Sequence, residues 1–223
     1  MQSDAMQSDP YVAPHGAATV LAHVASVVLS PLLIPTYAII LVFSLSMLSF
    51  APLGTKAIIT GMVFAITCLL PGAAVWLMVR FGGISDVALT QRTDRAIPYL
   101  ITGCAMLGCG YYLTTTGLPL WVGYFYVGAG LAVGVNLIIN LWWKISAHGA
   151  GIGGLIAMFL VLNRYGLPPY NLWVWCLAAV LLGGLLGTAR VWLGRHTPMQ
   201  TVCGEIVGFL GVISMELLFG GSY

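Results

Sequence analysis

Residues 120–143 read LWVGYFYVGAGLAVGVNLIINLWW, a stretch with no Asp, Glu, Lys or Arg and with Trp near both ends. Uninterrupted apolar runs of roughly 18 or more residues are typical of helices that cross a bilayer. Tryptophan favours the interface between hydrocarbon and water, so its position near both ends fits the same interpretation. This stretch therefore predicts a transmembrane helix and indicates the class of fold.

The rest of the chain has the same character, with 60% hydrophobic and 6% charged residues, against about 25% charged residues in soluble domains. Because backbone groups in lipid must be paired internally, the apolar segments are expected to be helices. Seven such segments are predicted, at about 17–50, 57–78, 97–116, 120–143, 150–163, 171–189 and 199–219. We expect an all-α integral membrane protein, a bundle of six to seven transmembrane helices in the lipid bilayer with its site at one membrane face.

Three further features limit the interpretation. The first segment is longer than one crossing needs, and Pro31 and Pro35 are expected to kink it or to split it into an interfacial piece and a span. Residues 1–15 are polar and predict a flexible tail, which leaves 16–223 as a single transmembrane domain. The net charge of +2 is too small to indicate nucleic acid as a partner.

The cations gather in the links that follow the second, fourth and sixth segments. These links hold Arg80, Arg92 and Arg95, then Lys144 and His148, then Arg190, Arg195 and His196. Each link follows an even number of crossings, so all three are expected on one membrane face. Two interpretations stay open: cytoplasmic loops marked by positive charge, or an anion site in which arginines bind phosphate and histidines supply a nucleophile and a proton donor.

Both histidines are expected beside helix N-termini. Ser146 predicts an N-cap for the fifth segment, and Thr197 predicts a cap with Pro198 at the first helical position. Free N–H groups at such ends suit a bound phosphate. The G-x-G-x-x-G pattern at 149–154 opens an apolar segment with no strand before it, so it indicates close helix packing rather than a dinucleotide site.

Three patches in this order resemble the type 2 phosphatidic acid phosphatase superfamily, whose patterns are K-x6-R-P, P-S-G-H and S-R-x5-H-x3-D. The corresponding residues are Arg92, Arg95 and Pro98, then Ile145, Ser146, Ala147 and His148, then Ala189, Arg190, His196 and Gln200. The match covers about 92–200, within a core of about 80–219.

The resemblance implies a metal-independent lipid phosphatase without a cofactor. His196 would attack phosphorus to form a phosphohistidine, and His148 would protonate the leaving oxygen. Gln200 stands where the family has an aspartate and would orient His196. The phosphate would be bound by Arg92, Arg95, Ser146 and Arg190, with Lys144 either contacting it or reaching for the interface.

The resemblance also implies a membrane phospholipid or polyprenyl phosphate as substrate, and a bacterial inner membrane with the site facing the periplasm. Two alternatives remain open. A lipid phosphotransferase would use an acceptor hydroxyl in place of water. A non-catalytic phosphate-lipid carrier would keep the binding residues only, and the change to Gln200 is its motivation.

Overall fold

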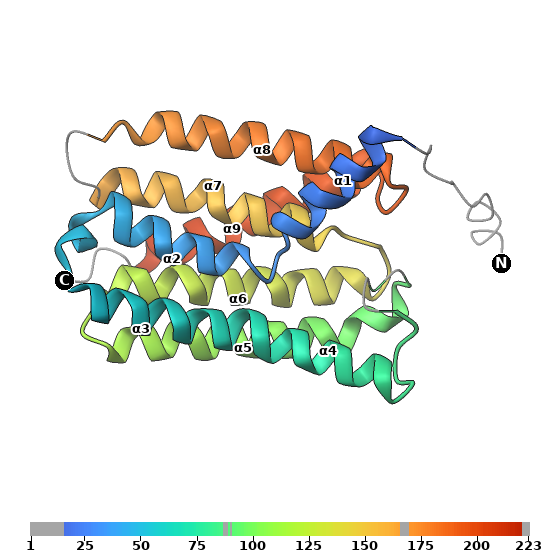
Figure 1. Ribbon diagram of the computed structural model, residues 1–223, viewed down its shortest axis with the longest axis horizontal. Coiled ribbons are helices and arrows are strands. Elements are labelled where there is room, and N and C mark those ends of the chain that lie inside the picture. The colour runs from blue at the N-terminus through green and yellow to red at the C-terminus, as the bar shows by residue number, and fades with distance from the viewer. Residues whose placement is uncertain (1–15, 87–88, 90, 166–169, 220–223) are drawn as a thin grey trace.

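The computed structural model describes residues 16–86, 89, 91–165 and 170–219, so the predicted tail at 1–15 lies outside the described residues. The helices lie side by side in one bundle (Figure 1). The elements are α1 (Ala17–Val28), α2 (Ile34–Leu45), the 3-10 turn η1 (Met47–Phe50), α3 (Leu53–Phe64), the π-helical turn η2 (Ala65–Leu69), α4 (Leu70–Arg80), the 3-10 turn η3 (Thr93–Arg95), α5 (Ala96–Thr115), α6 (Leu120–Asn140), α7 (Ala147–Tyr165), α8 (Leu172–Trp192) and α9 (Pro198–Phe219).

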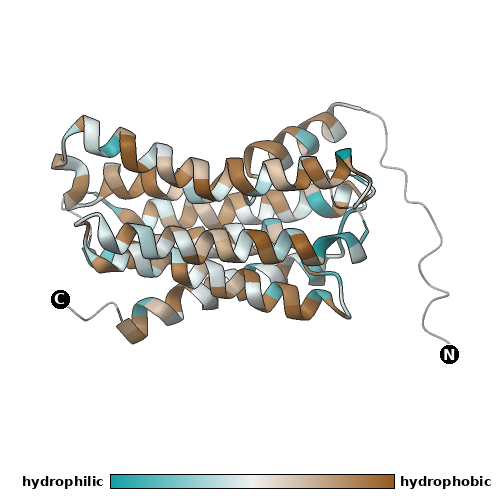
Figure 2. Cartoon of the chain, turned by 90° about the horizontal axis from the view of Figure 1, so that it is seen from below, coloured by the Kyte–Doolittle hydropathy of each residue, from teal (hydrophilic) through white to brown (hydrophobic). Residues whose placement is uncertain are grey.

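Six helical stretches in the described part of the chain are long and apolar enough to cross a membrane. They are Leu53–Arg80, Thr93–Thr115, Leu120–Asn140, Ala147–Arg164, Leu172–Trp192 and Pro198–Phe219. Hydrophobic residues cover the helices along their length, and hydrophilic ones gather mainly toward the ends of the bundle (Figure 2). The chain is therefore an all-α integral membrane protein, and the six long spans lie within the predicted range.

The first predicted segment does split, but into two short helices. Pro31 has no N–H to donate, and α1 ends before it; Pro35 lies in the first turn of α2. Each helix has 12 residues, about 18 Å at 1.5 Å per residue, which is shorter than the roughly 30 Å hydrocarbon core. The expected division into an interfacial piece and a full span was therefore wrong, because the break falls near the middle of the segment. Together α1 and α2 run from one end of the bundle to the other (Figure 1).

The links α4–α5, α6–α7 and α8–α9 lie at the same end of the bundle, which we call the site end (Figure 1). This arrangement is the one predicted from the even number of crossings. Helix α1 begins at the site end as well, where Trp192 Nε1 at the end of α8 donates a hydrogen bond to Thr19 Oγ1 at 3.2 Å.

Helices α7 and α9 pack backbone against backbone. A Cβ atom at Gly153 would lie 1.9 Å from the carbonyl oxygen of Glu205, and one at Gly208 would lie 1.9 Å from that of Ala150. Only glycine fits at such a distance, so the interpretation of the glycine pattern as a helix-packing motif is confirmed. Both helices start at the site end, so the packing brings their N-termini together (Figure 1).

Candidate functional site

A cavity of about 670 Å³ lies among the helices and extends to the site end, and we call this end of the cavity its mouth. Three cations and three histidines line it: Arg95, Arg190, Arg195, His23, His148 and His196. Four of these six were predicted site residues, and those four come from three separate links. The structure therefore brings the core of the predicted constellation into one cavity.

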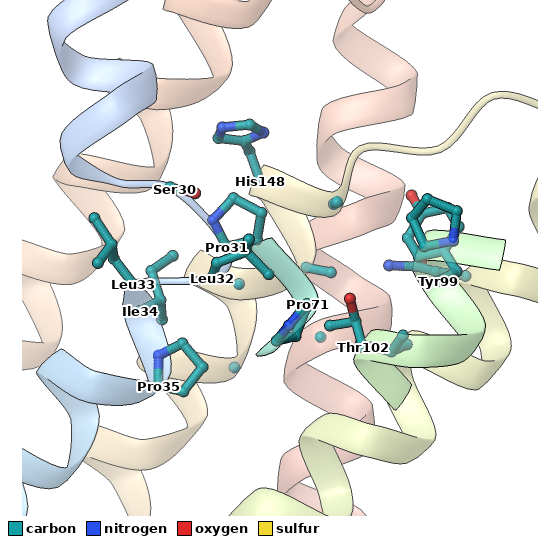
Figure 3. Close-up of a pocket in the computed structure, with 18 of the residues that line it drawn as sticks. Ser30, Pro31, Leu32, Leu33, Ile34, Pro35, Pro71, Tyr99, Thr102 and His148 are labelled. Atoms are coloured by element: carbon teal, nitrogen blue, oxygen red, sulfur yellow. The ribbon is translucent and has the colours of Figure 1, made fainter. Parts of the chain in front are cut away.

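The broken helix and α5 form opposite walls of this cavity. Figure 3 shows Pro31 and its neighbours in the α1–α2 break on one side, with Tyr99 and Thr102 of α5 on the other. His148, in the first turn of α7, lies above the break. The short helices at the start of the chain thus belong to the site, although their sequence carries no motif of the resembled family.

His148 is held by the last turn of α1, directly before the break. Its Nε2 atom lies 3.0 Å from the carbonyl oxygen of Ser26, in the last turn of α1. That carbonyl does not receive the usual helical N–H, because Ser30 donates to Val27 instead, at 3.2 Å. A carbonyl oxygen only accepts, so Nε2 carries the hydrogen of this bond.

The end of α8 explains the spacing between Arg190 and His196. Gly194 has φ of +64°, a left-handed conformation that favours glycine. The N–H of Arg195 donates to the carbonyl of Arg190 at 3.0 Å, and that of Gly194 donates to Val191 at 2.9 Å. This pair of bonds is a Schellman motif. The N–H of His196 also donates to the carbonyl of Arg190, at 3.3 Å. The R-x5-H spacing therefore corresponds to a chain that turns back at the end of α8 and brings the backbone of His196 next to that of Arg190.

Gln200 orients His196 through a capping box. Its Oε1 atom accepts the N–H of Thr197 at 3.2 Å, while its own N–H donates to Thr197 Oγ1 at 3.4 Å. The same Oε1 lies 3.1 Å from His196 Nδ1. An N–H can only donate, so the atom that Thr197 meets is the amide oxygen, and Nδ1 must donate to it. The Nε2 atom of neutral His196 is then left with the lone pair.

The orienting contact of Gln200 was expected, but its place in a capping box was missed. The sequence signal was present, since Thr197 and Gln200 are three residues apart before an apolar run. Gln200 therefore has two structural tasks, to cap α9 and to fix the ring of His196.

The environment keeps His196 neutral. The side chain is only 7% exposed, and this burial, followed by the charges of Arg95, Arg190 and Lys144, lowers the pKa of the ring from 6.5 to about 2. Burial and the same arginines, with Arg195, lower the pKa of Lys144 to about 8. A neutral imidazole has the lone pair that a nucleophile needs, and the surrounding positive charge favours an anion.

Two arginines supply that charge from inside the cavity wall. Arg95 is 6% exposed and is fixed by bonds from Nε to the carbonyl of Leu89, at 2.8 Å, and from Nη1 to that of Ile145, at 3.2 Å. The Nε atom of Arg190 is buried and has no hydrogen-bond partner. A buried charged donor without a partner is costly, and a bound anion would relieve that cost.

Arg92 is placed outside the cavity lining. Its Nη1 donates to the carbonyl oxygens of Asn140, at 3.1 Å, and Leu141. The side chain of Asn140 in turn donates to the carbonyl of Arg92 at 3.0 Å. Arg92 thus ties the start of α5 to the end of α6, where a cation also complements the helix dipole. The expected phosphate contact of Arg92 has no support in this geometry.

Ser146 and Lys144 also lie outside the cavity lining. Ser146 is fully buried, and its Oγ accepts the N–H of Gly149 at 3.2 Å, so its predicted role as N-cap of α7 is confirmed. Its N–H donates to the carbonyl of Gln200 at 3.2 Å, which ties the starts of α7 and α9 together. Arg195 was predicted as part of the cation cluster but was not assigned to the phosphate site. It lines the cavity, and the sequence signal for this was its position directly before His196.

Comparison of the chain with protein-family models, with curated proteins and with solved structures finds no match. The interpretation of the site therefore rests on its geometry and on the three sequence patches.

Proposed function

We propose that this chain is a lipid phosphatase that cleaves a phosphomonoester or pyrophosphate through a phosphohistidine. The supporting observation is buried His196, fixed on Gln200, which shares with Arg95 and Arg190 the cationic end of a mainly apolar cavity. A phosphate needs cations and a lipid chain needs apolar surface. This cavity offers both.

The reaction has two displacements. The Nε2 lone pair of His196 forms a bond to phosphorus while the bond from phosphorus to the lipid oxygen breaks, and that oxygen leaves with the electron pair and takes up a proton. Water then attacks phosphorus, the P–N bond breaks and phosphate leaves. Arg95 and Arg190 stabilise the charge that spreads over the equatorial oxygens in both steps.

His148 is proposed as the group that protonates the leaving oxygen: its ring first takes up a proton at Nδ1, then donates the hydrogen on Nε2 to the leaving oxygen and is left as a neutral imidazole. Its Nε2 hydrogen contacts the Ser26 carbonyl, so it must exchange this partner for the leaving group. A pyrophosphate substrate needs this proton less, because phosphate is a weaker base than an alkoxide and leaves more readily. The loss caused by removing His148 is therefore expected to be larger for phosphomonoesters than for pyrophosphates.

The proposed substrate is a membrane phospholipid or polyprenyl phosphate. The proposed location is a bacterial inner membrane with the site facing the periplasm, as in the family that the motifs resemble. Its test is accessibility of the site end to a membrane-impermeant reagent in intact cells.

Phosphate release by purified protein in detergent with EDTA, from a panel of phosphorylated lipids, tests the activity. His196→Asn is the sharpest variant, because its side-chain amide still donates to Gln200 but offers no nucleophile. We expect a loss of about 10⁴-fold or more, and an acid-labile phosphorus label on wild type alone. Equal release by both proteins would refute the proposal.

A non-catalytic phosphate-lipid carrier is the second candidate, favoured by one observation. The ring of His196 meets an uncharged amide, which cannot stabilise a cationic ring by charge. Saturable binding of lipid phosphate with no release, and no label, would support this candidate. Transfer of the label to an added hydroxyl lipid would instead identify a phosphotransferase.

A further inference from the structure

The cavity continues beyond its cationic mouth into the bundle. Deeper than Thr102 of α5 and Asn136 of α6, its lining is apolar or lacks a side chain: Met106 of α5, Phe125 and Ala129 of α6, Gly154 of α7 and Val212 of α9. Phosphate chemistry at the mouth uses none of these residues. The deep part is therefore available to another part of the ligand, and its lining fits hydrocarbon.

The depth of the cavity is large compared with the membrane. Along α6 the lining runs from Asn136 to Phe125, a rise of about 16 Å at 1.5 Å per residue, which is more than half of a hydrocarbon core of roughly 30 Å. Phe125 is the lining residue of α6 farthest from the site end. A volume of about 670 Å³ falls within the roughly 300–1,000 Å³ of pockets that hold one ligand.

The wall at α1 is apolar and exposed. Val27 lines the cavity and is 67% exposed. The break at Ser30–Leu33 follows directly and also lines the cavity. This wall is the route by which a lipid chain would enter the cavity from the side.

From these features we infer that the cavity takes one hydrocarbon chain of the lipid phosphate inside the bundle, and that Phe125 and Ala129 select its length. This inference rests on the proposed phosphate site at the mouth. The ligand class is a lipid phosphate with a single chain to insert; a two-chain lipid must leave its second chain in the bilayer.

Selection arises from shape rather than from hydrophobicity. A chain that moves from the bilayer into the cavity gains little hydrophobic energy, because lipid tails are as apolar as the lining. A chain that is too short leaves a void and loses dispersion contacts. One that is too long must displace packed side chains. Rates and affinities should therefore show an optimum in chain length.

The test uses n-alkyl phosphates of graded length with wild type, Ala129→Leu and Phe125→Leu. Each substitution changes the side chain by three carbons. Because interiors are close-packed, the optimum should shorten by about three carbons in Ala129→Leu and lengthen by about three in Phe125→Leu. Ala178→Leu, on the exposed surface of α8, is the matched control and should leave the optimum unchanged.

Two readouts separate this inference from the proposed function. Phosphate release is measured in these proteins, and the rise in Tm caused by each alkyl phosphate is measured in the same variants carrying His196→Asn. A length optimum of Tm that shifts with Ala129→Leu supports the inference even if no lipid is hydrolysed. Hydrolysis at rates that do not depend on length, or an optimum that neither cavity variant moves, overturns it while the proposed function stands.

Discussion

Gln200 Oε1 lies 3.1 Å from His196 Nδ1 and accepts the backbone N–H of Thr197 at 3.2 Å. One amide oxygen therefore both caps α9 and fixes the tautomer of the proposed nucleophile. The geometry of the contact is good, but an uncharged amide stabilises a cationic ring less than a carboxylate would. A carboxylate at this position would keep both contacts and would also stabilise the cationic ring.

The first prediction follows from that contact. In Gln200→Glu the capping box is kept, and a carboxylate beside the ring raises the pKa of His196, by about 1–3 units for such neighbours. Phosphate release should rise by about tenfold or more. Gln200→Leu, which removes the acceptor, should lower it by about 10²-fold or more. Steady-state release for the three proteins measures this order; a Glu variant slower than the Leu variant would contradict it.

The second prediction separates two arginines that the sequence motifs treat alike. Arg92→Ala removes charged hydrogen bonds to the carbonyls of Asn140 and Leu141, each bond contributing about 1.5–3 kcal/mol. We expect a lower Tm with KM nearly unchanged. Arg190→Ala should instead lower kcat/KM by about 10²-fold or more with a small change in Tm. Thermal unfolding and kinetics on the same preparations decide, and a KM defect in Arg92→Ala would restore that residue to the phosphate site.

The third prediction concerns alkaline pH. Lys144 loses its charge near pH 8 in the folded protein, against a reference value of 10.5. The field that attracts phosphate weakens there, so kcat/KM should fall as the pH rises through about 8. Between pH 8 and 10.5 Lys144 is protonated in the unfolded state and neutral in the folded state. The unfolded state then binds more protons, so the contribution of Lys144 to the free energy of unfolding should rise with pH over this interval. Lys144→Met should remove both trends, and a profile that persists in it would assign them to another group.

The fourth prediction tests the contact between α7 and α9. A methyl group at Gly208 would overlap the carbonyl oxygen of Ala150, at 1.9 Å, so Gly208→Ala must separate the two helices that present His148 and His196. We expect a loss of about 3 kcal/mol or more in unfolding free energy. Gly184→Ala is the control, because its Cβ meets nothing within 4 Å and alanine favours helix. Unfolding in a detergent series compares them; equal losses would mean that the contact is not tight.

Local rules made much of the fold predictable. The chain cannot leave backbone groups unpaired in lipid, so long apolar runs became helices with nearly the predicted bounds. Ser146 and Thr197 cap the expected helices because a cap depends only on the next three residues. For the same reason Arg190 and His196 meet across one helix end, with Gly194 supplying the turn.

The tertiary structure alone decided which side chains share the cavity. Arg92 binds residues 48 and 49 positions away, and His148 meets Ser26 across 122 positions. Such contacts depend on how each helix is rotated about its axis and which neighbour it packs against. In a chain that is apolar on every side, the hydrophobic pattern does not fix that rotation. The cavity, the role of the α1–α2 break and the separation of Arg92 from Arg95 all arise at this level.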